Sequence, residues 1–143
     1  MTKNNWLSYF RYMLVFVCYS FFSNKILMYW DKQMGMTYSP FPSMLWSMII
    51  FIILGLLLGL ETFLLETKKE GNWRVNLPKI ILLGVPTLYF SLGIFIMYLP
   101  LSFIQQTLSY PLQFFLEGST HFLSIFQVIF GYIIITSFAK VED

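Results

Sequence analysis

The chain has 143 residues, of which 57% are hydrophobic and only 11% are charged, and its formal net charge is +2. A soluble domain carries about a quarter charged residues, so this composition excludes a water-soluble module. The basic residues form short clusters beside apolar runs, which indicates membrane topology rather than nucleic-acid binding. We therefore expect an integral membrane protein whose surroundings are the lipid bilayer, with no nucleic acid among its partners.

Four long apolar runs follow one another along the chain, at residues 7–28, 41–65, 80–99 and 122–139. About 20 helical residues cross a hydrocarbon core of about 30 Å, so each run is long enough, or nearly so, to span a bilayer. The sequence thus predicts an all-α integral membrane protein, a four-transmembrane-helix bundle that forms a single membrane domain over residues 1–143. Its spans are predicted at approximately 7–28, 41–65, 80–99 and 120–139.

Two ionisable residues fall inside the first two spans. Arg11 lies about one turn inside the first span, and Glu61 a little over one turn from the end of the second. A charge within a span is costly and needs a reason. Both residues would lie near the cytoplasmic boundary at similar depth, so we predict an Arg11–Glu61 ion pair. The pair would clamp two helices together, or Glu61 would serve as a proton- or cation-linked carboxylate.

Small and polar residues mark the helix faces that are expected to meet. In the second span, Gly55 and Gly59 are four residues apart, a spacing that lets helix backbones approach closely. We favour intramolecular packing over dimerisation for this pair. We also expect Gln127, near the middle of the fourth span, to form a hydrogen bond across the bundle. The remaining predicted packing residues are Gly84, Thr87, Ser91, Ser124 and Gly131.

Pro86 lies inside the third apolar run. A proline there has no N–H to donate, so it is expected to leave the carbonyl of Leu82 without its helical partner and to bend the helix. Neighbouring helices or the hydroxyl of Thr87 can compensate for this defect.

The stretch from 102 to 117 is too apolar for an ordinary water-exposed loop. We expect an apolar outer interfacial segment between the third and fourth helices, which lies in the interface or folds back against the bundle. It could be a connector, a lid or a docking surface. His121 follows Glu117 by four residues, so the two could share a helical face, and both are candidate binding residues. A single histidine predicts no metal site.

The distribution of Lys and Arg orients the spans. Basic residues lie near the N-terminus, between the second and third spans, and in the C-terminal tail, whereas residues 100–119 contain none. Because cytoplasmic loops are enriched in Lys and Arg, both termini are predicted to be cytoplasmic. We expect the membrane to be a plasma membrane, of a bacterium.

No phosphate-binding loop, metal-ligand spacing or embedded acidic pair occurs in the sequence, so we expect no enzyme and no cofactor. We predict a non-catalytic partner, assembly or regulatory subunit of a larger membrane system, which binds another membrane protein or itself. The alternative is a small oligomeric transporter or channel that uses Glu61. One protomer has too few helices to enclose a sizeable polar pathway, so the alternative requires assembly.

Overall fold

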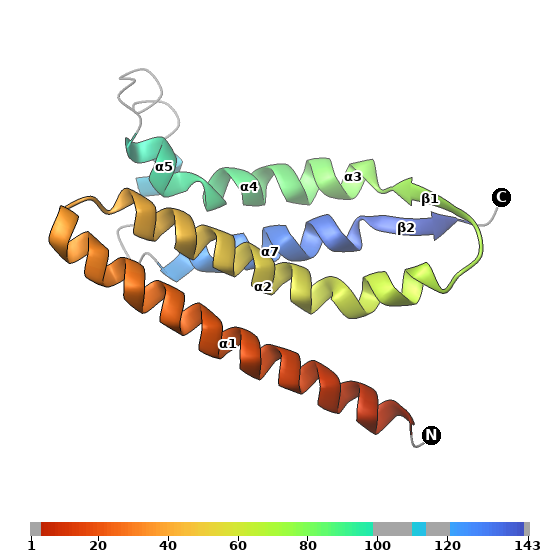
Figure 1. Cartoon of the computed structure of the whole chain (residues 1–143). Helices are drawn as coiled ribbons and strands as arrows, with labels where there is room; N and C mark the ends of the chain where they lie inside the picture. The colour runs from red at the N-terminus through yellow and green to blue at the C-terminus, as the bar shows by residue number, and fades with distance from the viewer. Residues whose placement is uncertain (1–3, 99–109, 114–120, 142–143) are drawn as a thin grey trace. The chain divides into compact units, whose positions relative to one another are not determined.

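The computed structural model of the chain describes residues 4–98, 110–113 and 121–141 (Figure 1). The described chain is mostly helical, which confirms the predicted helical fold. Two helical segments, Tyr9–Thr37 and Phe41–Thr67, are long and apolar enough to cross a membrane, and Leu77–Ser91 and Phe122–Thr136 are shorter apolar helices. The chain forms two compact units, residues 1–47 and 48–143.

The first unit contains α1 (Asn4–Thr37) and the first turns of α2 (Phe41–Thr67). With 34 residues, α1 is about 51 Å long and continues nine residues past the predicted end of the first span. No proline interrupts residues 29–37, so nothing in the sequence ends the helix earlier. It ends where Tyr38 takes a left-handed conformation, with φ of 52°, and donates its N–H to the Met34 carbonyl at 2.9 Å.

Two side-chain contacts hold the turn between α1 and α2. The Ser43 hydroxyl donates a hydrogen bond of 2.9 Å to the Asp31 carboxylate. The rings of Trp30 and Trp46 stack with their centroids 5.8 Å apart. Both contacts fasten the end of α1 to the start of α2.

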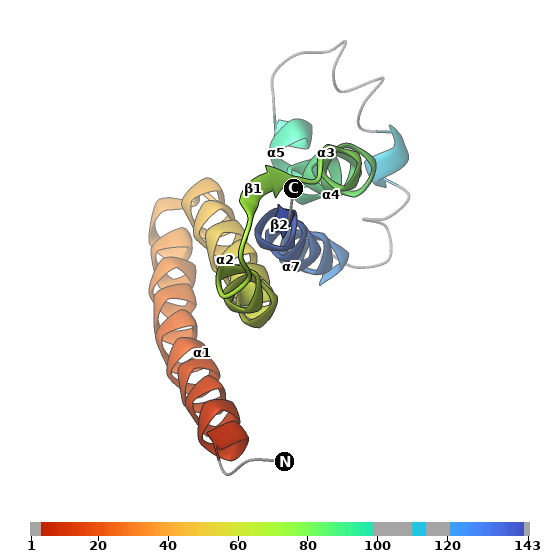
Figure 2. The same ribbon diagram turned by 90° about the vertical axis from the view of Figure 1, so that its right-hand side faces the viewer.

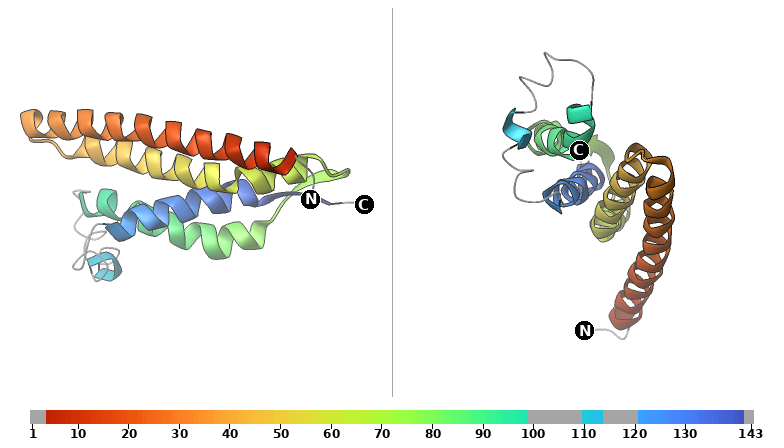
Figure 3. Two further views of the ribbon diagram at one scale, coloured as in Figure 1. Left: turned by 90° about the horizontal axis from the view of Figure 1, so that it is seen from below. Right: turned by 90° about the vertical axis from the view of Figure 1, so that its left-hand side faces the viewer.

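The described residues of the second unit form helical stretches at 48–67, 77–98, 110–113 and 121–136 and a small sheet. α7 (His121–Thr136) packs against α2 through one face and against α4 (Val85–Ser91) through the other (Figures 2 and 3). The other elements are β1 (Asn72–Val75), α3 (Leu77–Lys79), η1 (Ile80–Gly84), α5 (Gly93–Tyr98), a helical turn at 110–113 and β2 (Phe138–Val141).

α2 and α7 run parallel and touch through glycines. A Cβ atom added to Gly55 would lie 2.0 Å from the Val128 carbonyl oxygen, and one added to Gly131 would lie 2.1 Å from that of Ile52. Only a residue without a side chain fits at either position. Gly59 lies one turn further along, where an added Cβ would meet the Ile135 side chain at 2.2 Å. The close approach maximises van der Waals contact between backbones, as small residues do in membrane helices.

The helix around Pro86 is irregular in a way that the sequence did not predict in detail. η1 is one turn of π-helix, in which the Val85 N–H donates to the Ile80 carbonyl. Such a wide turn absorbs a break in the helical hydrogen-bond ladder. The Thr87 hydroxyl donates to the carbonyls of Leu83 at 2.7 Å and Gly84 at 3.0 Å, rather than to that of Leu82.

The two-stranded antiparallel sheet was not predicted. β1 pairs with β2 in a register that places Trp73 opposite Lys140 and Val75 opposite Phe138. Both strands contain valine and an aromatic residue, which favour extended backbone. α7 therefore ends at Thr136, three residues before the predicted end of the fourth span, and the chain continues as β2.

Candidate functional site

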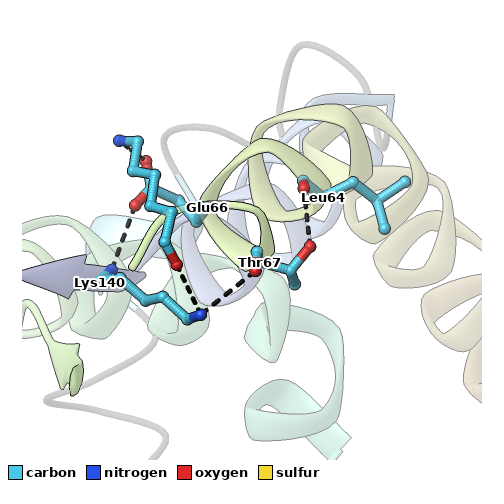
Figure 4. A network of polar contacts seen from close by, with 5 residues as sticks. Leu64, Glu66, Thr67 and Lys140 are labelled. Atoms are coloured by element: carbon cyan, nitrogen blue, oxygen red, sulfur yellow. Dashed lines mark hydrogen bonds and ion pairs between the residues drawn. The ribbon is translucent and has the colours of Figure 1, made fainter. Parts of the chain in front are cut away.

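The densest polar cluster of the described residues joins the end of α2 to β2 (Figure 4). One Glu66 carboxylate oxygen accepts a hydrogen bond from the Lys69 ammonium, and the other accepts the Lys140 backbone N–H at 3.1 Å. Both oxygens of the carboxylate are therefore occupied. We call Glu66, Lys69 and Lys140 the Glu66 clasp.

The Lys140 side chain completes the clasp from the other side. Its ammonium donates to the carbonyls of Thr67 at 3.2 Å and Lys69 at 2.7 Å, directly after the last turn of α2. It also lies 5.4 Å from the ring centroid of Trp73, which in turn stacks on Phe63. The last carbonyls of a helix have no intrahelical partner and carry partial negative charge, so a lysine there is favourable.

Lys79 forms a second cap of the same kind, at the end of α7. Its ammonium donates to the Thr136 carbonyl at 3.1 Å and to the Thr136 hydroxyl at 2.7 Å, and it lies 5.9 Å from the ring centroid of Tyr132. The Asn76 N–H donates to the carbonyl of the next residue, Ser137, at 2.8 Å. One end of the unit thus has two helix termini that are each closed by a lysine.

These contacts indicate a structural role for the clustered charges. The ammonium groups of Lys79 and Lys140 donate to backbone carbonyls, and the Glu66 carboxylate accepts from two donors. Within the ranges that the structure describes, no three His, Cys, Asp or Glu side chains gather in a group that could hold a metal ion. The cluster fastens the sheet to the helices.

A second polar group lies deep between α4 and α7. Gln127, which is 6% exposed, donates through Nε2 to the Ser91 carbonyl at 3.4 Å, so the predicted bond across the bundle is weak by its length. The Ser91 hydroxyl donates within its own helix to the Thr87 carbonyl at 2.7 Å. The Gln127 Oε1 atom is buried and accepts no hydrogen bond from the described residues.

Five of the seven predicted packing residues lie in two helix–helix contacts. Gly55, Gly59 and Gly131 lie between α2 and α7, and Gly84 and Ser91 lie between the helix of Pro86 and α7. Thr87 is satisfied within its own helix. Ser124 lines a shallow apolar groove of about 240 Å³, together with Phe51, Ile125, Val128 and Ile129.

The two residues of the predicted ion pair lie in different units. Arg11 lies on α1 in the first unit, and Glu61 lies on α2 in the second. Glu61 is two residues after Gly59, which at about 100° per residue turns it to the side of α2 opposite α7. The Arg11–Glu61 ion pair stays a prediction. His121 is the first residue of α7, and its suggested neighbour Glu117 lies outside the described residues.

A regular apolar row on α1 was not predicted. The positions 7, 10, 14, 17, 21, 24 and 28 alternate in steps of three and four residues, the spacing of a helix–helix seam. Asn24 is the single polar member. We call this row the α1 seam. Its apolar side chains are between 45% and 69% exposed, and they are Leu7, Phe10, Leu14, Val17, Phe21 and Met28. A search for heptad spacing would have found it.

Comparisons with protein-family models, with curated proteins and with solved structures find no match to this chain.

Proposed function

We propose that this protein is a non-catalytic subunit that binds a larger membrane protein through the α1 seam. Four of its helical stretches cross the bilayer in this proposal, and both termini are cytoplasmic. The proposal rests on one observation above all: a row of large apolar side chains in heptad spacing is exposed along more than five turns of α1.

Other faces of α1 also expose apolar side chains, among them Tyr9, Met13, Val15 and Phe22, so we select the seam for its regular spacing together with Asn24. Contact with lipid requires only apolar side chains, in any order. Steps of three and four residues keep the same narrow stripe facing a second helix, and large side chains in that stripe fit into the gaps of the partner. Phe10 and Phe21, which lie three turns apart, are the largest such side chains.

Asn24 adds specificity to the seam. An amide within an apolar helix surface is costly in hydrocarbon unless it finds a hydrogen-bond partner. A single polar residue in a seam also fixes the register of two helices. We infer that the partner presents a donor or acceptor at the depth of Asn24.

The lengths of α1 and α2 support two of the proposed crossings, and the other two apolar helical stretches are shorter. α1 and α2 measure about 51 Å and about 40 Å, which exceeds a hydrocarbon core of about 30 Å. From Leu77 to Ser91 the chain is continuously helical, which gives about 22 Å, and α5 follows after the break at Leu92. The 16 residues of α7 give about 24 Å. Basic residues lie at the end of the second unit that contains β1 and β2. Because Lys and Arg are enriched on the cytoplasmic side of a membrane, this end is cytoplasmic in the proposal.

The proposal is tested by purifying the tagged full-length protein from its own membranes in a mild detergent. Phe21 and Phe22 make a matched pair, because both are about 70% exposed and adjacent, but only Phe21 belongs to the seam. The protein and its Phe22→Ala variant should retain the same partner in constant ratio. Phe21→Ala should lose most of it, because an aromatic anchor at such an interface contributes about 2 kcal/mol or more.

If the protein purifies as a monomer without any partner and is active in that form, the result counts against the proposal. Equal losses of partner in Phe21→Ala and Phe22→Ala would show that no seam exists and that general hydrophobicity holds the complex together. Both variants should first be shown to reach the membrane at the level of the unchanged protein.

A further inference from the structure

The sheet formed by β1 and β2 has two edges, and a carboxylate covers the edge of β2. The Asn76 N–H donates to the Ser137 carbonyl at 2.8 Å, directly after the last residue pair of the sheet. Because bonded and non-bonded pairs alternate along an antiparallel ladder, this bond turns the N–H of Lys140 away from β1. That N–H donates instead to the Glu66 carboxylate at 3.1 Å.

The same alternation leaves the edge of β1 open. Trp73 and Val75 belong to the pairs that are not hydrogen-bonded, so their N–H and C=O groups point outward from the sheet. Among the described residues, none donates to these groups or accepts from them. All four residues of β1 are exposed. An open strand edge of this kind is a template for pairing with another extended chain.

The side chains of β1 determine which extended chain fits. Trp73, Val75 and Phe138 lie on one face of the sheet and are between 39% and 47% exposed. Arg74 lies on the other face and is exposed as well. In an added antiparallel strand, two residues would lie opposite Trp73 and Val75, and the residue between them would lie opposite Arg74. The matching pattern is therefore apolar, acidic, apolar.

A second copy of this chain fits the edge poorly. When Trp73 of one copy pairs with Val75 of the other, two antiparallel β1 strands place their Arg74 residues directly opposite each other. Like charges in that position destabilise a strand pair. An acidic residue there has the opposite effect, so charge complementarity favours a segment from a different protein.

We propose that the open edge of β1 binds an extended segment of a partner protein as a third, antiparallel strand, with a carboxylate opposite Arg74. The two residues that flank the carboxylate exchange backbone hydrogen bonds with Trp73 and Val75. In strand addition the main-chain bonds provide affinity and the side chains provide specificity. This surface is separate from the α1 seam, and the inference does not depend on a partner being bound there.

The first test measures the charge preference. A fluorescent peptide, Thr-Val-Glu-Val-Thr, is titrated with the full chain in phosphatidylcholine nanodiscs, and binding is followed by anisotropy. Replacing the glutamate with lysine should weaken binding by about threefold or more. Arg74→Glu should reverse this preference. Lys68→Glu makes the same charge change in the turn before β1 and should leave the preference as it is.

The second test distinguishes strand addition from simple charge attraction. In the proposed antiparallel register, both valine N–H groups of the peptide face β1, and the glutamate N–H faces away. A methyl group on either valine nitrogen should therefore weaken binding by about tenfold or more. A methyl group on the glutamate nitrogen should leave binding unchanged.

The third test removes one donor from the edge of β1. Val75→Pro loses an outward N–H but no bond of the ladder, so the sheet should persist while peptide binding falls. Val75→Thr keeps the N–H and a branched side chain, and it should bind the peptide as the unchanged protein does. Should Val75→Pro fail to fold, the methylated peptides still decide between the two explanations.

Three results would overturn the proposal. The lysine peptide could bind as well as the glutamate peptide, or all three methylated peptides could bind equally. Amide exchange could also show that, without peptide, protection of β1 rises with protein concentration. A second copy of the chain would then occupy the edge.

Discussion

Gly55 and Gly131 lie on opposite sides of one helix crossing, each against the backbone of the helix that carries the other. A Cβ on Gly55 would meet the Val128 carbonyl oxygen at 2.0 Å, and a Cβ on Gly131 would meet the Ile52 carbonyl oxygen at 2.1 Å. The reciprocity means that neither helix can move away to accommodate a methyl group without losing the contact at the other glycine. This crossing determines the distance between α2 and α7.

Alanine at either glycine should therefore destabilise the protein. We expect Gly55→Ala and Gly131→Ala to lower the free energy of unfolding by about 2 kcal/mol or more, because the added methyl group meets backbone rather than a movable side chain. Gly59→Ala should cost less, since Ile135 can change rotamer. The measurement is reversible unfolding in detergent, followed by circular dichroism.

Gly84→Ala is the matched control for this series. Its added Cβ would lie 3.6 Å from the Ile80 side chain and 3.7 Å from that of Ile133, which is ordinary contact. Alanine favours the helix over glycine by about 1 kcal/mol, so this variant should be as stable as the unchanged protein or more so. A uniform loss at all four glycines would show that crowding at the α2–α7 crossing is not the cause.

Removal of the Lys79 ammonium should loosen the end of α7. Lys79→Met keeps the apolar stem but leaves the Thr136 carbonyl without the donor at 3.1 Å. We expect a loss of about 1–2 kcal/mol from the hydrogen bonds and the interaction with the helix terminus together. Lys68→Met removes a positive charge that belongs to neither lysine cap, so it should cost little. Similar losses from both variants would favour a general charge effect over capping.

Glu66 should control how firmly β2 is held. Glu66→Ala removes the acceptor of the Lys140 N–H, so amide hydrogen exchange at Lys140 should become at least several-fold faster. Glu70→Ala removes a nearby carboxylate that is outside the clasp and should leave this rate unchanged. The comparison is made by mass spectrometry on the full chain. Unchanged exchange in Glu66→Ala would show that strand pairing alone retains β2.

The predicted Arg11–Glu61 pair is tested by exchanging the charges. Arg11→Glu and Glu61→Arg should each reduce the thermal stability of the protein in membranes, and the double variant should recover part of the loss. Contacting charges couple by about 0.5–3 kcal/mol. Additive losses would exclude the pair. If Glu61→Gln instead leaves assembly intact and abolishes a pH-dependent activity, the carboxylate serves transport.

The sequence predicted the helical class and the residues that pack closely more readily than the termini of the elements. Apolar runs and glycine spacing are local signals, and Gly55 and Gly131 lie where helix backbones meet. The two strands were missed because 72–75 and 138–141 are short and pair across more than 60 residues. The role of Lys79 was missed for a similar reason, since its partner Thr136 is 57 residues away and a cap of this kind has no sequence spacing of its own.

Site-specific photocrosslinking on α1 tests the central claim most directly. A photoreactive phenylalanine analogue replaces Phe21 in one variant and Phe22 in the other, and each is irradiated in intact membranes. We predict a discrete protein adduct of constant mass from position 21 and chiefly lipid adducts from position 22. Lipid adducts from both positions would contradict the account, because they would show that the α1 seam faces the bilayer and not a protein partner.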